Sequence, residues 1–256
     1  MRIVALTCSN TEIVCALGCS DQLVGVDDHS DFPEPVVARC ARVGPDLGID
    51  VARVAALKPD LVLASLTVPG HERVIEQLER AGLPFIAPEP RSLADVCSNI
   101  RTIAELLGVT ARAKALIAEL EPELFARPAA SGLRLLVEWW PKPIIVPGRD
   151  SWVTELLLAA GAINPLAQRP VKSQPLTDAD AALLEPDASV IAWCGVRTEK
   201  YRRDVVLRRP DWQHLKLVRE GRVYRVPEAW LGRPGPRLVL GVRALRQIVL
   251  ELAAAP

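Results

Sequence analysis

The chain has 256 residues, of which 50% are hydrophobic, and its 31 basic side chains are balanced by 31 acidic ones. This length and composition allow two lobes of ordinary size, each with a buried core. The balanced charge argues against a nucleic-acid partner. No apolar run approaches the roughly 20 residues that a membrane span requires, so we expect a globular protein without a span.

The N-terminus lacks the pattern of a secretory signal. Residues 1–6 (MRIVAL) run directly into the polar residues 9–12 (SNTE), without an extended apolar region or a small-residue cleavage site. The six cysteines are irregularly spaced, which favours reduced, mostly buried thiols over a disulfide framework. Both features predict a cytoplasmic protein. A chain whose leader had been removed would instead be periplasmic or on the cell surface.

A pattern of helix end, Pro-Asp turn and buried strand occurs twice, at residues 54–64 and 181–192. Pro ends the helix, Asp suits the turn, and the short apolar run is typical of a parallel strand that is covered on both faces. A second repeated pattern lies at residues 11–18 and 151–161. Both segments begin with capping residues and end in Gly. Two strand-helix-strand copies predict two α/β lobes of one architecture.

Helical periodicity joins the two copies and continues beyond them. Residues 93–107 and 110–125 have apolar side chains at helical spacing, and we interpret this segment as one long helical connector. The expected organisation is an N-terminal lobe at 1–92, bridging helices at 93–128 and a C-terminal lobe at 129–256. In the second lobe we expect further elements in this order: strand 133–139, helix 151–160, strand 189–193, strand 223–227 and helix 236–252.

All six tryptophans lie after residue 138. Four of them, Trp139, Trp140, Trp193 and Trp230, sit at or just past the end of a predicted strand. In open parallel sheets the ligand crevice lies outside the carboxyl ends of the strands. Each Trp alone is as well explained by core packing. Together they predict a flat apolar wall that suits a large planar ligand.

Two polar segments occupy comparable places after predicted strands. Arg149 precedes a helix start and is a candidate for an anionic ligand group, whereas its neighbours Asp150 and Ser151 are better explained as helix caps. In the first lobe, the loop Ser9-Asn10-Thr11 takes the equivalent position. It is either a ligand contact or a helix cap.

No metal or catalytic motif is present in the sequence. His29, His71 and His214 are the only histidines, and none has a second ligand at a metal-binding spacing, so we interpret them as surface residues and predict no metal site. Nucleophile-elbow, P-loop and dinucleotide fingerprints are lacking, and histidines that would serve as a general base are few. The sequence therefore predicts a binding protein rather than an enzyme, without a resident cofactor.

Four motifs are spread along the chain: SNTEI (9–13) with ALG (16–18), LKPDLV (57–62), GRDSW (148–152) with Gly161 and Asn164, and RPGPR (233–237). Together they resemble the cobalamin and ferric-siderophore class of periplasmic solute-binding proteins of ABC importers. The resemblance runs nearly from end to end, and heme, siderophore and corrinoid binders share these motifs.

The resemblance implies two Rossmann-like lobes with parallel central sheets, bridged by one long helix, and a ligand cleft between the lobes. It also implies docking on the importer's membrane subunits through one acidic residue on each lobe. Glu72 matches the first of these; it also suits a helix start, where a carboxylate is stabilised by the helix dipole. The second-lobe positions hold Gly232 and Leu240 instead of an acid, so half of the docking pair is missing.

The sequence favours a monomeric solute-binding protein that takes a cobalamin-like corrinoid in the interlobe cleft, for ABC-type uptake or intracellular handling. Two alternatives remain open at this point. One is a heme, ferric-siderophore or metal-ion binder on the same scaffold, and the other is an enzyme that acts on a bound cofactor.

Overall fold

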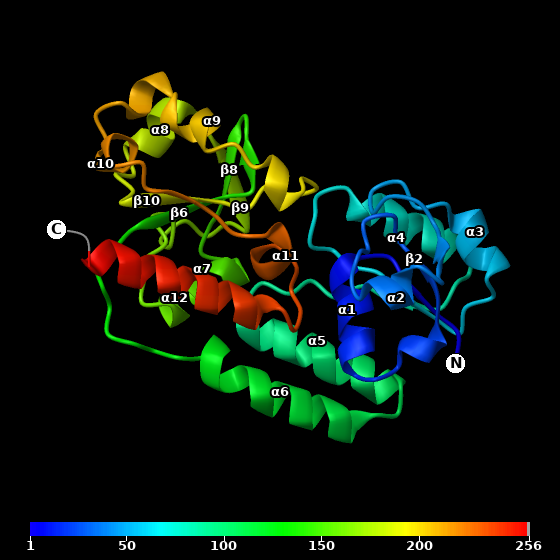
Figure 1. Cartoon of the computed structure of the whole chain (residues 1–256). Helices are drawn as coiled ribbons and strands as arrows, with labels where there is room; N and C mark the ends of the chain where they lie inside the picture. Colours follow the sequence, from blue (N-terminus) through cyan, green and yellow to red (C-terminus); the bar gives the residue numbers. More distant parts are fainter. Residues whose placement is uncertain (255–256) are drawn as a thin grey trace. The chain divides into compact units, whose positions relative to one another are not determined.

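The computed structural model describes residues 1–254 of the chain, which form two compact units (Figure 1). Unit 1 comprises residues 1–90 and 94–119, and unit 2 comprises residues 91–93 and the described residues from 120 onward. The boundary therefore falls inside the segment that the sequence pattern marks as a bridge. Within residues 1–254, none of the helices combines the length and the apolar character that crossing a bilayer requires.

Unit 1 is built on a five-stranded sheet in which all neighbouring strands are parallel. Of its three inner strands, β1 and β4 are buried along their whole length, as expected for a sheet covered on both faces. The strands, in spatial order, are β3 (Ala41–Arg42), β2 (Leu23–Val26), β1 (Ile3–Ala5), β4 (Leu61–Leu63) and β5 (Phe85–Ile86).

Helices connect these strands, and two more helices follow the last strand in sequence. The expected single connector is a pair of helices, α5 and α6, because the chain breaks helical conformation at 107–109, where Gly108 adopts φ 68°. The helices are α1 (Cys8–Ala16), α2 (Glu34–Val37), α3 (Val51–Ala56), α4 (His71–Arg80), α5 (Leu93–Leu106) and α6 (Thr110–Leu124), with a 3₁₀ turn η1 at Ser20–Gln22.

Unit 2 contains two three-stranded sheets. The first is parallel, in the order β11 (Val223–Arg225), β10 (Ala188–Ile191) and β6 (Leu135–Glu138). The second is antiparallel, in the order β7 (Trp140–Pro141), β8 (Ile144–Pro147) and β9 (Ser173–Leu176). The predicted parallel strands are thus confirmed, and the antiparallel sheet is an addition that the strand pattern did not reveal.

The helices of unit 2 include the long C-terminal helix α12, which packs against α7 and α11. A hydrophobic core of unit 2 surrounds Trp212, which is fully buried. The indole Nε1 of Trp212 donates to the Asp178 carbonyl at 2.8 Å. The helices are α7 (Trp152–Ala159), α8 (Asp178–Ala182), α9 (Arg203–Leu207), α10 (Lys216–Arg219), α11 (Glu228–Leu231) and α12 (Leu238–Ala254), with 3₁₀ turns η2 (Thr198–Lys200) and η3 (Pro210–Trp212).

The Pro-Asp repeat forms an anchor at the start of the first strand of unit 1. The backbone N–H of Arg2 donates to the Asp60 carboxylate at 2.7 Å, and the Asp60 N–H donates back to the Arg2 carbonyl at 2.8 Å. The Arg2 guanidinium also donates to the Leu57 carbonyl at 2.8 Å. Lys58, between these partners, adopts the left-handed conformation with φ 47°.

The same anchor recurs in unit 2. The Arg134 N–H donates to the Asp187 carboxylate at 2.8 Å, the Asp187 N–H returns a bond at 2.9 Å, and the Arg134 guanidinium donates to the Leu184 carbonyl at 3.0 Å. Glu185 adopts φ 44°, as Lys58 does in the first copy. Each copy of the sequence repeat therefore forms the same hydrogen-bonded turn.

A buried ion pair holds the end of β6. Glu138 is fully buried and accepts two bonds from the Arg209 guanidinium, at 2.8 and 3.0 Å, and a third from the Ser189 hydroxyl at 2.7 Å. The same guanidinium lies 4.4 Å from the centre of the Trp212 ring and donates to the Pro141 carbonyl at 3.4 Å. Arg209 thus contacts the chain on both sides of Trp139-Trp140.

Replacing Arg209 with Met should lower the free energy of unfolding by about 3 to 5 kcal/mol, because the Glu138 carboxylate would remain buried without its counter-charge. The double variant Glu138→Met/Arg209→Met should regain much of this loss, since no buried charge is left unpaired. Urea denaturation of both variants, with the exposed neighbour Arg208→Met as control, measures the difference. Equal losses in the single and the double variant would contradict this role for the ion pair.

Candidate functional site

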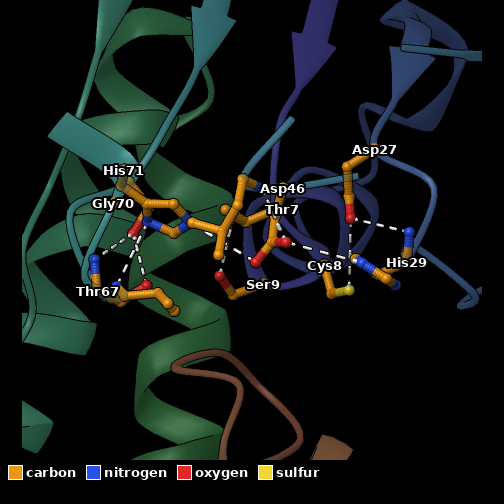
Figure 2. A network of polar contacts seen from close by, with 12 residues as sticks. Thr7, Cys8, Ser9, Asp27, His29, Asp46, Thr67, Gly70 and His71 are labelled. Atoms are coloured by element: carbon orange, nitrogen blue, oxygen red, sulfur yellow. Dashed lines mark hydrogen bonds and ion pairs between the residues drawn. The ribbon is translucent and has the colours of Figure 1, made fainter. Parts of the chain in front are cut away.

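The carboxyl edge of the unit 1 sheet gathers polar side chains from four neighbouring strands. Because parallel strands end at the same edge, the loops after β3, β2, β1 and β4 meet there. Figure 2 shows the resulting network, in which polar residues from all four loops face one another. Its members include Asp46 after β3, Asp27 and His29 after β2, Thr7, Cys8 and Ser9 after β1, and Thr67 and His71 after β4.

Asp46 lies between two imidazoles in this network. His29 Nε2 is 3.7 Å from one carboxylate oxygen and His71 Nε2 is 3.6 Å from the other (Figure 2). The Leu47 N–H donates to the carboxylate at 2.9 Å. The adjacent His71 holds the pKa of the Asp46 carboxyl below its usual value, more than offsetting the opposing effect of burial. Asp46 is therefore a carboxylate that stays ionised at neutral pH.

His71 corrects the expectation that the histidines are surface residues. It is the first residue of α4 and only 3% exposed, because Gly70, with φ 105°, turns the chain inward just before the helix. The Val68 N–H donates to His71 Nδ1 at 3.4 Å, which places the proton of the neutral ring on Nε2. Nε2 is buried and has no hydrogen-bond partner among the described residues.

Asp27 is the buried carboxyl of the same edge. It is fully buried and accepts bonds from the Ser30 hydroxyl at 2.5 Å and the His29 N–H at 3.0 Å, with the Cys8 thiol 4.0 Å away. Burial raises the pKa of Asp27, and the bonds from Ser30 and His29 oppose that shift. Asp27 thus fixes the loop that presents His29.

The predicted loop Ser9-Asn10-Thr11 is instead the first turn of helix α1. All three side chains are buried. Asn10 donates to the carbonyls of Leu63 and Ala64, at 3.2 and 2.8 Å, and Thr11 bonds the Ser30 hydroxyl at 2.9 Å. These contacts tie the end of β4 and the loop after β2 to α1.

In unit 2, an aromatic cluster follows the strand ends. The rings of Trp139 and Trp152 lie 6.2 Å apart, and the Trp152 Nε1 donates to the Leu231 carbonyl at 2.7 Å, next to Trp230. The Trp139 carbonyl accepts a bond from Cys194 N–H at 3.0 Å, which joins the ends of β6 and β10. Trp152, which the strand-end pattern missed because it begins a helix, is buried and packs against Trp139.

The four predicted tryptophans differ in exposure. Trp140 is 41% exposed, and Trp139 and Trp230 are half-buried. Trp193 is only 5% exposed and packs in the core, with its ring 5.7 Å from that of Tyr201. Trp140 is therefore the side chain of this group with the most surface free for a ligand.

The remaining polar candidates lie at helix starts. Ser151 caps α7 by accepting a bond from the Val153 N–H, as expected, while Arg149 is exposed and pairs with Asp150 at 3.1 Å. Glu72 is exposed in the first turn of α4 and accepts a bond from the Gly70 N–H at 2.8 Å. Among residues 1–254, no group of three His, Cys, Asp or Glu side chains is placed to hold a metal ion.

Comparisons with known proteins agree on one family. The family model described as "Periplasmic binding protein" matches residues 3–229. The ABC transporter substrate-binding lipoprotein YvrC of Bacillus subtilis is 31% identical over 97% of this chain and 79% of its own. The vitamin B12-binding protein of Pectobacterium carotovorum is 26% identical over 99% of this chain and 88% of its own.

Solved structures share the fold over the whole chain. A periplasmic heme-binding protein from Pseudomonas aeruginosa has a TM-score of 0.83 and 27% identity, covering 100% of this chain and 94% of its own. The vitamin B12-binding protein BtuF of Vibrio cholerae has a TM-score of 0.76 over 99% of this chain and 98% of its own; at 21% identity it supports the fold alone.

These comparisons correct the predicted compartment. The expectation of a cytoplasmic protein, based on the first residues and on the scattered cysteines, is wrong, because the matching family is periplasmic and the Bacillus relative is a lipoprotein. The relatives are binding proteins and not enzymes. Since the family model covers most of the sequence and YvrC exceeds 30% identity along almost all of it, the chain belongs to the periplasmic binding protein family.

Proposed function

We propose that this chain is the substrate-binding protein of an ABC importer and that its ligand is a corrinoid. The observation that carries the proposal is that three tryptophans at the strand ends of unit 2 keep exposed surface: Trp140 is 41% exposed, and Trp139 and Trp230 are half-buried. The buried Trp152 packs against Trp139, with ring centroids 6.2 Å apart. A broad apolar ring system stacks well on such a surface, because aromatic faces offer large contact areas at little cost in conformational entropy. Vitamin B12-binding relatives at 24–26% identity support the same class of ligand.

Heme is the second candidate ligand. The Pseudomonas heme-binding protein is 27% identical, and a porphyrin is also a large planar ring that suits stacking on Trp. In unit 1, the His29 side chain is 53% exposed and lies beside the Asp46 carboxylate. An exposed imidazole next to a carboxylate can ligate iron.

The other predicted site residues enter the proposal in two roles. Arg149 is exposed and available to an anionic group of the ligand. Ser9, Asn10 and Thr11, which are buried and hydrogen-bonded to neighbouring strand-end loops, shape the carboxyl edge of unit 1.

For importer docking, we propose Glu72 as the contact on unit 1, since its carboxylate is exposed at the start of α4. Unit 2 has Gly232 at the comparable position. The nearest preceding acid, Glu228, has a side chain that is only 17% exposed and pairs with Arg233 at 3.2 Å. Docking would then depend on unit 1 more than in relatives that carry both acids.

Titration with cyanocobalamin, hemin and a ferric hydroxamate siderophore tests the ligand class, with intrinsic Trp fluorescence as the readout. We expect cyanocobalamin to quench the fluorescence and to bind most tightly, because the proposed contact surface is aromatic. Tight binding of hemin with no response to cyanocobalamin would contradict the corrinoid proposal.

Two Trp variants test the site. Trp140→Ala should weaken cyanocobalamin binding by about 1 to 3 kcal/mol, roughly ten- to a hundredfold, and leave stability almost unchanged, because the ring is largely outside the core. Trp193→Ala is the matched control and should lower the free energy of unfolding by about 3 to 5 kcal/mol through cavity formation. If Trp140→Ala bound cyanocobalamin as tightly as the wild type, Trp140 would not be part of the site.

A further inference from the structure

The Asp46 carboxylate is a negative charge at the carboxyl edge of unit 1 that no Lys or Arg neutralises within the described part of the chain. Its ion-pair partners there are His29 and His71, each beyond 3.5 Å. Its side chain is 31% exposed, so a ligand at this edge can reach it. The guanidinium of Arg42, at the end of β3, is instead engaged with the backbone carbonyls of Asp27 and Ser30, at 2.8 and 2.7 Å.

The carboxylate also has unused capacity to accept hydrogen bonds. It accepts one at normal distance, from the Leu47 N–H at 2.9 Å, whereas a carboxylate offers about four acceptor positions. The two imidazole nitrogens, at 3.7 and 3.6 Å, are too far for ordinary bonds. The free positions suit ligand N–H groups.

His71 supplies an independent sign that this cluster is incomplete without a ligand. Its Nε2 carries a proton, because Nδ1 accepts from Val68, yet Nε2 is buried and has no hydrogen-bond partner among the described residues. A buried N–H donor without an acceptor lowers stability, and the carbonyl oxygen of a primary amide would supply that acceptor beside its own N–H groups. In Figure 2 the His71 ring points toward Asp46 from one side and the His29 ring from the other.

The sign of the local charge decides which ligands suit this edge. Asp46 remains ionised over the neutral and mildly acid range, since its pKa lies below the usual value, with His71 as the main cause. Asp28, in the neighbouring loop, is a second exposed acid, and its N–H donates to the Gly44 carbonyl at 2.9 Å in the loop that carries Asp46. A ligand carboxylate placed here would meet like charges, whereas a primary amide would offer N–H donors.

We infer that Asp46 is a specificity-determining residue that selects ligands with amide groups at their rim over ligands with carboxylates. The inference rests on the proposed function and deepens it. Corrinoids carry neutral peripheral amides, whereas heme carries two propionates, so Asp46 favours the corrinoid over heme by charge. His29 and His71 hold the carboxylate between them.

The test compares cyanocobalamin with its monocarboxylate derivatives, in which one peripheral amide is hydrolysed, by titration calorimetry on the full chain. The wild type should bind the amide form about tenfold more tightly than at least one monocarboxylate, because placing like charges together is unfavourable. Asp46→Asn should reduce this ratio to about threefold or less by removing the charge. It should also improve the binding of hemin relative to cyanocobalamin.

Asp21→Asn is the matched control. Asp21 is exposed in η1, which precedes β2 and so lies toward the opposite edge of the sheet, and the variant removes the same charge. The Asp21→Asn variant should keep the wild-type ratio of the affinity for cyanocobalamin to that for the monocarboxylate. Thermal unfolding of both variants establishes that they are folded.

If Asp46→Asn does not fold, a salt titration of the wild type tests the same inference. The ratio of the affinity for cyanocobalamin to the affinity for the monocarboxylate should fall as salt rises from 20 to 500 mM, because ions screen charge repulsion at an exposed carboxylate.

The outcomes separate the inference from the proposed function. If cyanocobalamin binds but the monocarboxylates bind equally well, or if Asp46→Asn or high salt leaves the ratio unchanged, the inference is overturned while corrinoid binding stands. If hemin binds and no corrinoid does, the proposed ligand class is overturned, and the selection by Asp46 falls with it.

Discussion

The parallel pairing of strands is the constraint on which the candidate site depends. In a parallel sheet the carboxyl ends of all strands lie at the same edge. Residues far apart in sequence are therefore brought together there. In unit 1 this places loops after four strands side by side, and His29, Asp46 and His71 meet although 42 positions separate the first from the last. The first turns of the helices that follow also contribute, since His71 begins α4 and Ser9 lies in α1. Chemistry at this edge is therefore a product of topology.

Unit 2 uses the same constraint with different chemistry. Its strand ends are held by the buried Glu138–Arg209 pair and lead into aromatic residues, not into charged ones. The ion pair contributes mainly geometry, because a buried pair is at best weakly stabilising compared with apolar packing, whereas one partner alone is strongly unfavourable. We propose that the aromatic residues of unit 2 provide contact area for a planar ligand, and that the charged edge of unit 1 provides selectivity.

The burial of His71 and of Trp193 has a common physical cause, and the predicted compartment failed for a different reason. His71 stands in a segment with no metal-binding spacing, and its burial follows from the turn at Gly70 and the approach of the loop after β3, neither of which leaves a local pattern. Trp193 follows a strand as Trp140 does, but packing around Tyr201 buries it. The compartment was predicted from the first residues and from cysteine spacing, and the family contradicts it.

The sequence by itself determined the two-fold repeat, the buried parallel strands and the positions of the main helices, because these follow from short-range patterns of apolar residues, Pro, Asp and Gly. The Pro59-Asp60 turn and its copy at Pro186-Asp187 recur as a local pattern, but their matching hydrogen bonds join residues 58 and 53 positions apart, so the tertiary structure completes them. Only the tertiary structure decided which polar and aromatic side chains are buried, which are exposed, and that a carboxylate lies between two imidazoles. Those outcomes depend on contacts between segments distant in the chain, whose register no local pattern encodes.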